Sequence, residues 1–214
     1  GASPAIKGDD AAYVFFTSGS TGRPKAILGC HKGLSQFLEW QRQTFDIGQD
    51  DRISQLIALS FDPLLRDVFL PLTSGGTVCL PQEQDAFSAL RWLQDERITV
   101  VHTTPSLLQS WLAVENAEVA LPNLRWLFLS GESLTGGLIA RWRQCCATNA
   151  RIVNLYGPTE TTMVRCYYTV PDEFEMGAQP IGRPIAQTQA LVISAAGLPC
   201  GVSEPGEIVL RTPF

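Results

Sequence analysis

The sequence predicts an α/β fold in which a mostly parallel sheet is flanked by helices on both faces. Short apolar runs alternate along the chain with stretches whose apolar residues recur at helical spacing, a pattern typical of repeated β-α units. With 214 residues, 45% of them hydrophobic and 17% charged, the chain can bury a substantial core. In sheets of this kind, ligands bind outside the carboxyl ends of the strands. We therefore expect the functional residues in the loops that follow the strands.

Each element is predicted from an apolar run or from helical spacing. In chain order, strands are expected at Ala11–Phe16, Ala26–Gly29, Arg52–Leu59, Thr77–Leu80, Ile98–His102, Leu124–Leu129 and Arg151–Leu155, the first of them buried. Helices are expected from His31 to Gly48, from Pro63 to Leu72, over Asp85–Glu96, after Pro105 and around Leu138–Trp142. Most of the polar motifs follow directly after one of these strands.

Beyond Met163 the pattern changes to short β-rich segments separated by glycine, proline and polar residues. These segments are Met163–Val170, Gln189–Ser194 and Glu207–Arg211. We expect an α/β nucleotide- and substrate-binding subdomain over residues 1–162 and the start of a β-rich subdomain, truncated, over residues 163–214.

Composition and charge exclude several classes of partner. The net charge is -5 and the basic residues are scattered, so an electrostatic site for nucleic acid is not expected. No apolar stretch approaches the ~20 residues that span a bilayer, and no signal peptide is visible, so we expect a cytoplasmic protein without membrane contact. The six cysteines lack C-x-x-C spacing, so neither a zinc site nor a disulfide framework is indicated. The expected ligand is a small molecule.

The loop Thr17–Lys25 (TSGSTGRPK) has the composition of a phosphate site. Its glycines permit a close approach of backbone N–H groups to an anion, its hydroxyls donate further hydrogen bonds, and Lys25 supplies a positive charge. The alternative is an ordinary turn or linker, which Ser/Thr/Gly clusters commonly form. A Walker-type P-loop does not fit, because Lys25 comes three residues after Gly22 and follows Pro24.

A second motif, Asn154–Thr162 (NLYGPTETT), follows the strand predicted at Arg151–Leu155. Taken alone it is a Gly-Pro turn. Together and in this order, TSGSTGRPK and NLYGPTETT resemble the phosphate-binding and adenylation motifs of the adenylate-forming enzymes, which include acyl-CoA synthetases, luciferases and the adenylation domains of nonribosomal peptide synthetases. SFDPLLRDVF, around Asp62, resembles the amino-acid adenylation domains in particular. This resemblance implies that the predicted sheet is part of a larger adenylation-domain fold.

The resemblance implies a nucleotide site for ATP and Mg²⁺. By this resemblance Thr17, Lys25 and Glu160 have catalytic roles. Glu160 and Thr17 are also implied to bind Mg²⁺, which prefers oxygen ligands. The residues implied to bind the nucleotide are Thr17, Ser18, Gly19, Ser20, Thr21, Gly22, Lys25, Gly131, Glu132, Asn154, Tyr156, Gly157 and Thr159.

The resemblance also implies a pocket for the acyl substrate. In it Asp62 pairs with the α-ammonium group of an amino acid, although its place before Pro63 is also that of a helix N-cap. The residues that match the pocket are Asp62, Pro63, Arg66, His102, Phe128, Ser130, Leu155, Met163 and Val164. Arg66 and His102 could meet a polar or acidic side chain, unless Arg66 turns outward beside Asp67. We expect an α-amino acid, with a lean toward a polar side chain.

Adenylation enzymes are considerably longer than this chain, and both of its ends look cut. It has no counterpart of the later ribose-binding aspartate, the hinge or the C-terminal lysine. We therefore expect a fragment, inactive alone, of a domain that activates an amino acid with ATP and loads it onto the phosphopantetheine thiol of a carrier-protein domain. Its partners would include the missing N- and C-terminal parts of that domain. The alternatives are an acyl- or aryl-CoA ligase, which would not need Asp62, and a non-catalytic binding module.

Overall fold

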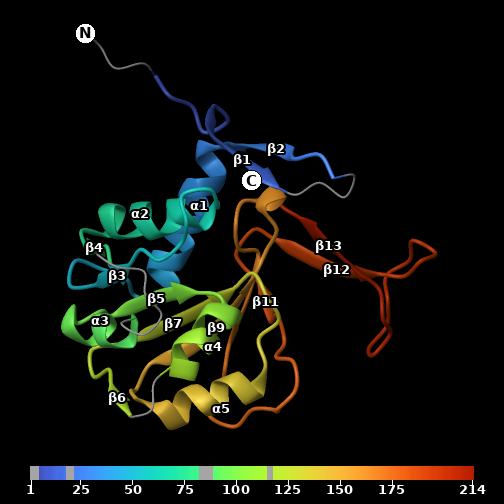
Figure 1. The fold of residues 1–214 in the computed structure, drawn as a ribbon. Helices are drawn as coiled ribbons and strands as arrows, with labels where there is room; N and C mark the ends of the chain where they lie inside the picture. Colours follow the sequence, from blue (N-terminus) through green and yellow to red (C-terminus); the bar gives the residue numbers. More distant parts are fainter. Residues whose placement is uncertain (1–4, 18–21, 82–88, 115–117) are drawn as a thin grey trace.

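The computed structural model describes residues 5–17, 22–81, 89–114 and 118–214. Within these residues the central feature is a seven-stranded sheet of order β11-β10-β9-β7-β5-β3-β4 (Figure 1). Its parallel strands are β4 (Thr77–Cys79), β3 (Arg52–Ser54), β5 (Val100–Thr103), β7 (Trp126–Ser130) and β9 (Arg151–Tyr156). At the other edge β10 (Cys166–Thr169) runs antiparallel to β9, and β11 (Arg183–Pro184) antiparallel to β10. The predicted, mostly parallel sheet is confirmed.

Helices cover both faces of this sheet, as predicted. In Figure 1, α1 (His31–Thr44) and α2 (Pro63–Ser74) lie above it, while α3 (Ala89–Asp95), α4 (Pro105–Val114) and α5 (Gly136–Cys145) lie below it. The first part of the helix predicted at Asp85–Glu96 falls outside the described residues. None of the helices in the described part of the chain is long and apolar enough to cross a membrane.

Successive strand residues point to opposite faces and so divide the core in two. Val100 belongs to the same buried cluster as Phe37 of α1, and its neighbour Val101 belongs to the cluster that contains Trp111 of α4. In β7, Phe128 and Leu127 divide in the same way. The strands of such a sheet are therefore apolar at nearly every position, which explains why they could be predicted from continuous apolar runs.

The run predicted as a buried strand at Ala11–Phe16 is a strand, but it lies outside the central sheet and is not buried. β1 (Ala11–Thr17) pairs only with β2 (Lys25–Cys30), antiparallel, in a sheet of two strands within the described residues. Val14 is 52% exposed and Phe16 is 66% exposed. The prediction of burial was wrong because no element of the described chain covers the face of the pair that carries Val14 and Phe16.

The strand predicted at Arg52–Leu59 ends early, at Ser54. From Gln55 onward the chain leaves the sheet, and a turn in which Phe61 N–H donates to the Ala58 carbonyl at 3.1 Å leads into α2. The apolar residues that suggested a longer strand instead form part of a cavity wall.

The C-terminal residues are β-rich, as predicted. β12 (Gln189–Ile193) and β13 (Glu207–Arg211) form an antiparallel pair that projects from the central sheet in Figure 1. β10, from the segment predicted at Met163–Val170, instead belongs to the central sheet. The subdomain boundary after residue 162 therefore stays a prediction. The remaining elements are a short parallel pair, β6 (Val119–Ala120) with β8 (Cys146–Ala147), and one turn of 3-10 helix, η1 (Thr159–Thr161).

The strand order creates a crevice at the carboxyl ends of β3 and β5. The chain passes from β3 through α2 to β4 on one side, then returns to β5 on the other side of β3. Connections that leave a sheet in opposite directions open a gap at its edge, and ligands of α/β sheets bind at such points.

Candidate active site

A cavity of about 550 Å³ opens at this edge of the sheet. Four strands contribute the residues that follow their carboxyl ends, and the first turns of α2 complete the wall. The lining residues are Leu56, Ile57, Ala58, Phe61, Asp62, Pro63, Arg66, Thr104, Leu107, Ser130, Gly131, Glu132, Leu155, Gly157, Pro158, Thr159, Met163 and Val164. We call this space the large cavity.

A second hollow of about 390 Å³, here called the small cavity, adjoins it. The two share residues of the loops after β7 and β9, namely Gly131, Glu132, Leu155, Gly157 and Pro158. The small cavity adds Asn154 and Tyr156. Most of the residues that the sequence predicted for the acyl group line the large cavity, and several of those predicted for the nucleotide line the small one.

Asp62 is a buried carboxylate in the wall of the large cavity. It occupies the N-cap position of α2 but makes no side-chain cap hydrogen bond, so its predicted capping role is wrong. Its Oδ1 accepts a hydrogen bond from the Thr159 hydroxyl at 3.2 Å. Burial raises the pKa of Asp62, and the hydrogen bond from Thr159 opposes this shift. No lysine, arginine or histidine of the described residues lies within ion-pair distance of Asp62.

The two sequence motifs meet at Lys25 and Glu160. Lys25 Nζ lies 3.9 Å from Glu160 Oε1, with side chains 63% and 44% exposed. Thr17 is the direct cross-strand partner of Lys25 at the end of the β1–β2 pair where the chain joins the two strands. The three residues predicted as catalytic therefore belong to two adjacent segments. Ser18, Gly19, Ser20 and Thr21 lie outside the described residues.

The segment after η1 has an unusual backbone. Thr162 and Met163 have φ of 62° and 58°, a left-handed conformation that is uncommon for residues other than glycine. A Cβ on Gly157 would lie 2.0 Å from the Met163 carbonyl oxygen, so this close approach requires glycine. The paired β9 and β10 fix both ends of the loop, and the loop places Thr159 and Met163 in the cavity wall.

Arg165 ties this loop to α1. It is fully buried, and its guanidinium donates to the Thr161 carbonyl and, at 2.9 Å, to Gln36 Oε1. Burial lowers the pKa of Arg165 to about 10, which leaves the guanidinium charged at neutral pH. Composition gave no signal for this residue, because arginine is usually exposed.

Arg66 turns inward, which excludes the outward orientation considered from the sequence. It is 1% exposed, and its Nε donates to Asp67 Oδ1 at 2.9 Å. His102 Nδ1 lies 3.5 Å from the same oxygen, and His102 Nε2 lies 2.7 Å from Gln41 Nε2. Burial, with a smaller effect from Arg66, holds the pKa of His102 well below its usual 6.5, so this imidazole is neutral. We call these four residues the buried polar cluster.

Two predicted substrate residues do not reach the large cavity. His102 and Phe128 are fully buried, and their rings stack with centroids 4.7 Å apart. They lie behind the wall and do not line the cavity. The predicted substrate residues that do line it are Asp62, Pro63, Arg66, Ser130, Leu155, Met163 and Val164.

Two predicted nucleotide residues also make structural hydrogen bonds. Glu132 accepts from the Ser106 backbone N–H at 2.9 Å and the Ser106 hydroxyl at 2.6 Å, in the first turn of α4. Asn154 donates to the Pro180 carbonyl at 2.9 Å. Gly131, with φ of 87°, holds a turn that needs glycine. Sequence reasoning missed Leu56, Ile57 and Thr104 in the wall, although their positions after β3 and β5 could have indicated them.

Glu160 and Thr17 suit the hard cation that the sequence implied. Glu160 is half-exposed, and within the described residues its carboxylate has only the long contact with Lys25. A carboxylate with free oxygen atoms, on a segment next to the strand pair that carries Thr17, is the kind of partial site that Mg²⁺ completes with phosphate oxygens and water. No cluster of three or more His, Cys, Asp or Glu that could hold a metal occurs in the part of the chain that is described.

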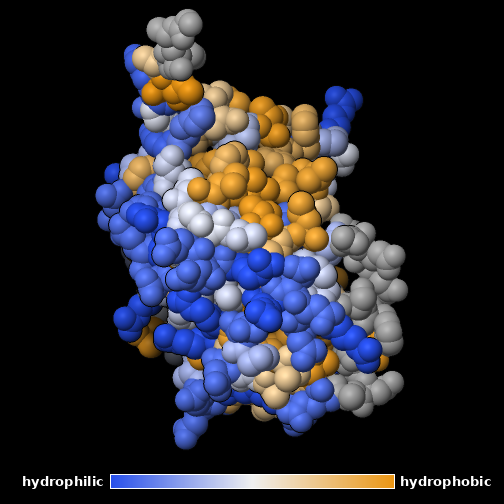
Figure 2. Space-filling model, turned by 90° about the vertical axis from the view of Figure 1, so that its left-hand side faces the viewer, coloured by the Kyte–Doolittle hydropathy of each residue, from blue (hydrophilic) through white to orange (hydrophobic). Residues whose placement is uncertain are grey.

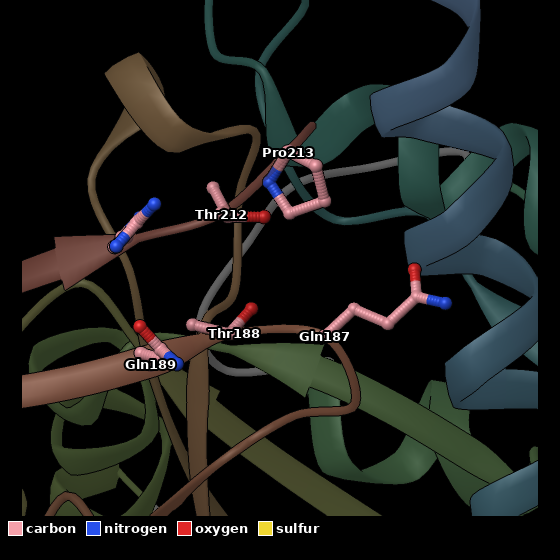
Figure 3. Close-up of a pocket in the computed structure, with 6 residues that line it drawn as sticks. Gln187, Thr188, Gln189, Thr212 and Pro213 are labelled. Atoms are coloured by element: carbon pink, nitrogen blue, oxygen red, sulfur yellow. The ribbon is translucent and has the colours of Figure 1, made fainter.

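A third hollow, of about 550 Å³, lies away from these residues. Figure 3 shows Thr188 and Gln189 on one side of it, Thr212 and Pro213 on the other, and Gln187 extending toward α1. None of the predicted site residues lines it. The candidate site therefore remains at the carboxyl edge of the central sheet.

Comparison with known proteins shows the family of the chain. A family model described as AMP-binding enzyme matches residues 1–214. Tyrocidine synthase 3 of Brevibacillus parabrevis is 35% identical over 94% of this chain, and L-2-aminoadipate reductase of Schizosaccharomyces pombe is 34% identical over 95%. The chain spans only 3% and 15% of these two relatives. The solved adenylation domain AlmE of Vibrio cholerae, in complex with glycyl-adenosine-5'-phosphate, superposes with a TM-score of 0.83 at 30% identity, over 90% of this chain and 36% of that one.

Proposed function

We propose that this chain, which belongs to the AMP-binding enzyme family, is the central part of an adenylation domain that activates an α-amino acid with ATP. The substrate carboxylate attacks the α-phosphorus of ATP, a bond forms between that oxygen and phosphorus, and the bond to the β-phosphate breaks to release pyrophosphate. The products are an aminoacyl-adenylate and pyrophosphate. Catalysis of such a step depends on positioning and charge stabilisation, because no covalent bond to the protein forms.

The observation that carries this proposal is the state of Asp62. Asp62 is a buried carboxylate that makes no ion pair within the described residues; the hydrogen bond from Thr159 and the charge of Arg66 only partly offset the cost of its burial, so a cationic ligand would be favourable beside it. An α-ammonium group in the large cavity would be that ligand, through a charge-assisted hydrogen bond. An acyl- or aryl-CoA ligase would have no use for this carboxylate, and a non-catalytic module would not need both motifs in place. Neither alternative is favoured.

The residues of this chain have separate tasks in the proposed reaction. Asp62 orients the amino acid so that its carboxylate faces the junction of the two cavities. Gly131, Tyr156 and Gly157 hold the nucleoside in the small cavity. Lys25 and the loop before it bind phosphate oxygens, while Glu160 with Thr17 would hold Mg²⁺. When bound, Mg²⁺ neutralises charge on the phosphates.

We infer that the adenylate is passed to the phosphopantetheine thiol of a carrier-protein domain. The relatives support an amino-acid substrate, since one is named for L-2-aminoadipate and AlmE is bound to glycyl-adenosine-5'-phosphate. Attack of the thiol on the acyl carbon would form a thioester and release AMP. The identity of the amino acid and of the carrier are not fixed by these relatives.

Further parts of the domain would cover the apolar surface of α2. Figure 2 shows apolar side chains gathered on the upper part of this face, where α2 and the β1–β2 pair lie. Exposed apolar side chains are Phe69 and Leu72 on α2, Leu59 and Phe61 just before it, and Leu28 on β2. Continuous apolar patches of this kind usually mark an interface. Since the solved adenylation domain is considerably longer than this chain, we propose that parts of the same domain pack here.

The proposal is tested by ATP–pyrophosphate exchange in the full-length protein that contains this chain. Exchange should depend on an α-amino acid, and the des-amino and 2-hydroxy analogues should be at least tenfold poorer. Asp62→Ala should remove most of the exchange, while Asp62→Glu retains the charge and serves as the matched control. Equal activation of the analogues by the unsubstituted protein would overturn the assignment of Asp62 and favour a ligase for acids without an amino group.

A further inference from the structure

We propose that Tyr13 is a positioning residue for the phosphate end of the site. Through Thr162 it holds the β1–β2 pair against the loop that carries Glu160. This proposal rests on the proposed function and adds a residue that lies outside both sequence motifs. It is carried by a hydrogen bond between residues 149 positions apart in the chain and by the glycines that make room for that bond.

Tyr13 shares one face of the β1–β2 pair with the residues of the phosphate end. Alternate residues of a strand point to the same side, so Tyr13 and Thr17 lie on one face of β1, opposite to the exposed Val14. Lys25 pairs directly with Thr17, and directly opposed residues of an antiparallel pair share a face as well. This face therefore carries the phenol ring toward one end and Thr17 with Lys25 at the other.

The same face meets the loop around η1 at two points. The Tyr13 hydroxyl donates to Thr162 Oγ1 at 3.4 Å, and Lys25 Nζ lies 3.9 Å from Glu160 Oε1. The contact of Lys25 with Glu160 joins two exposed side chains and fixes little by itself. Thr162, in contrast, is buried. The bond from Tyr13 is long for two hydroxyls, so what holds the two groups in place is the packing around them.

Two glycines provide this packing. The ring of Tyr13 lies across its strand partner Gly29, where an added Cβ would come within 1.9 Å of a ring carbon. On the other side, a Cβ on Gly33 of α1 would lie 2.8 Å from Thr162 Oγ1. Thr162 also has a φ of 62°, and a backbone of this kind persists only where its surroundings fix it. Both hydroxyl groups are therefore seated closely against neighbouring backbone.

The phenol of Tyr13 is in the protonated form that such a bond requires. Burial raises the pKa of Tyr13 above its usual 10, and the hydrogen bond to Thr162 opposes this shift. At neutral pH the hydroxyl therefore keeps its proton and donates it to the Thr162 oxygen.

The contact at Tyr13 fixes the direction of the whole strand pair. β2 ends at Cys30 and α1 begins at the next residue, so this junction alone would let the pair turn about it. Tyr13 adds a second fixed point near the same end. Thr17 lies four residues, about 13 Å, further along the strand. A small rotation at Tyr13 therefore becomes a larger displacement of Lys25 from Glu160.

The test is Tyr13→Phe in the full-length protein, which removes the hydroxyl and keeps the ring. The kcat of ATP–pyrophosphate exchange should fall about tenfold, because displaced groups position the phosphates poorly. The KM for the amino acid should change less than about twofold, since Asp62 is held by α2. A readout without turnover is calorimetric titration with ATP in the absence of Mg²⁺, in which the Kd should rise about threefold or more.

The partner hydroxyl gives the second arm of this test. Thr162→Val keeps the shape of the side chain and should reproduce the effects of Tyr13→Phe. Thr162→Ser keeps a hydroxyl and should retain most of the rate. The double variant Tyr13→Phe with Thr162→Val should be no slower than the slower single variant, because both substitutions remove one contact.

Tyr168→Phe is the matched control. It deletes the same group from a half-buried tyrosine of β10 that packs with the buried cluster containing Trp111 and Trp142. It should leave both kcat and the Kd for ATP unchanged. If these two quantities are also unchanged in Tyr13→Phe, even with a lower stability toward urea, Tyr13 is merely structural and this inference is overturned while the proposed function stands. Absence of exchange by the unsubstituted protein with any amino acid would overturn the proposed function, and this inference with it.

Discussion

The two ends of the candidate site are built in opposite ways. At the acyl end, Asp62, Arg66 and Asp67 are buried charges, held by α2 and by a cluster that reaches through the domain to α1. At the phosphate end, Lys25 and Glu160 are exposed charges on a two-stranded pair and a single turn of helix. Buried charges are oriented before a ligand arrives and can select it, whereas exposed charges are screened by water until phosphate and metal displace it. Under the proposed function, selection of the amino acid and stabilisation of phosphate charge would therefore take place at separate ends of the site.

The largest effect is expected from a substitution at the phosphate end, and it should change the rate of pyrophosphate exchange without changing stability. Glu160→Gln in the full-length protein keeps the shape of the side chain but loses its charge. We expect kcat of pyrophosphate exchange to fall about 100-fold to 1,000-fold, or about 3 to 4 kcal/mol. Exchange rates as a function of Mg²⁺ concentration provide the measurement. An unchanged rate with an unchanged magnesium dependence would reassign Glu160 to a structural role.

At the acyl end, we expect the free energy of unfolding to depend on pH through Asp67. Burial raises its pKa from the usual 3.8 to about 6, and Arg66 opposes this shift. Between about pH 4 and pH 6 the folded state holds this proton while the unfolded state has lost it, so the contribution of Asp67 to stability falls as pH rises across this window. The shift corresponds to about 3 kcal/mol.

The other groups that face Asp67 decide how this prediction is measured. His102, whose pKa is lowered, contributes in the opposite sense, because the unfolded state takes up a proton below pH 6.5 that the folded state does not. Gln41, which also belongs to the buried polar cluster, has no titratable group. The unfolding free energy of the unsubstituted domain therefore changes less with pH than Asp67 alone would make it change. The difference between this domain and Asp67→Asn isolates the contribution of Asp67. Relative to the unsubstituted domain, this variant should gain about 3 kcal/mol between pH 4 and pH 6 in urea unfolding. A constant difference would contradict the buried, ionisable state of Asp67.

The loop that joins the two ends should be sensitive to a single methyl group. A Cβ on Gly157 would lie 2.0 Å from the Met163 carbonyl oxygen, so Gly157→Ala must displace the loop. We expect a loss of about 2 kcal/mol in unfolding free energy, together with a raised KM for both ATP and the amino acid. Gly137→Ala, in a helix with nothing within 4 Å of the added Cβ, is the control. Equal stability of both variants would show that the close approach does not exist.

The smallest effect is expected on stability at the phosphate end. Lys25→Met removes the partner of Glu160, but both side chains are largely exposed and 3.9 Å apart. Exposed pairs of this kind stabilise a fold by little, so the unfolding free energy should change by less than about 0.5 kcal/mol. Chemical denaturation of the complete domain measures this. A loss several times larger would place Lys25 among the structural residues and remove the contrast between the two ends.

The sequence predicted most of the central sheet because its strands are apolar on both faces. Trp126–Ser130 and Arg151–Tyr156 were expected within two residues of their observed ends. At Ala11–Phe16 the same criterion predicted the strand correctly but not its exposure, and at Leu56–Ala58 it predicted strand where the chain lines a cavity. Pairing partners decide whether such a run joins a sheet, forms a separate pair or lines a cavity, and these partners are distant in the sequence.

The candidate site was predicted where short motifs follow strands, and missed where burial depends on distant contacts. Asp62 and Glu160 lie within motifs and were expected to face ligands. The inward turn of Arg66 depends on Asp67 beside it and on the distant residues His102 and Gln41, which its own surroundings in the sequence do not reveal. Arg165 had no signal at all, since its partners Thr161 and Gln36 are joined only by the fold.

The most direct test of the account is a crystal structure of the complete domain with a non-hydrolysable aminoacyl-adenylate analogue. The amino group of the analogue should lie within hydrogen-bond distance of the Asp62 carboxylate, and its adenine should lie in the small cavity beside Gly131 and Tyr156. An amino group directed away from Asp62, or a nucleoside bound outside the small cavity, would contradict the account.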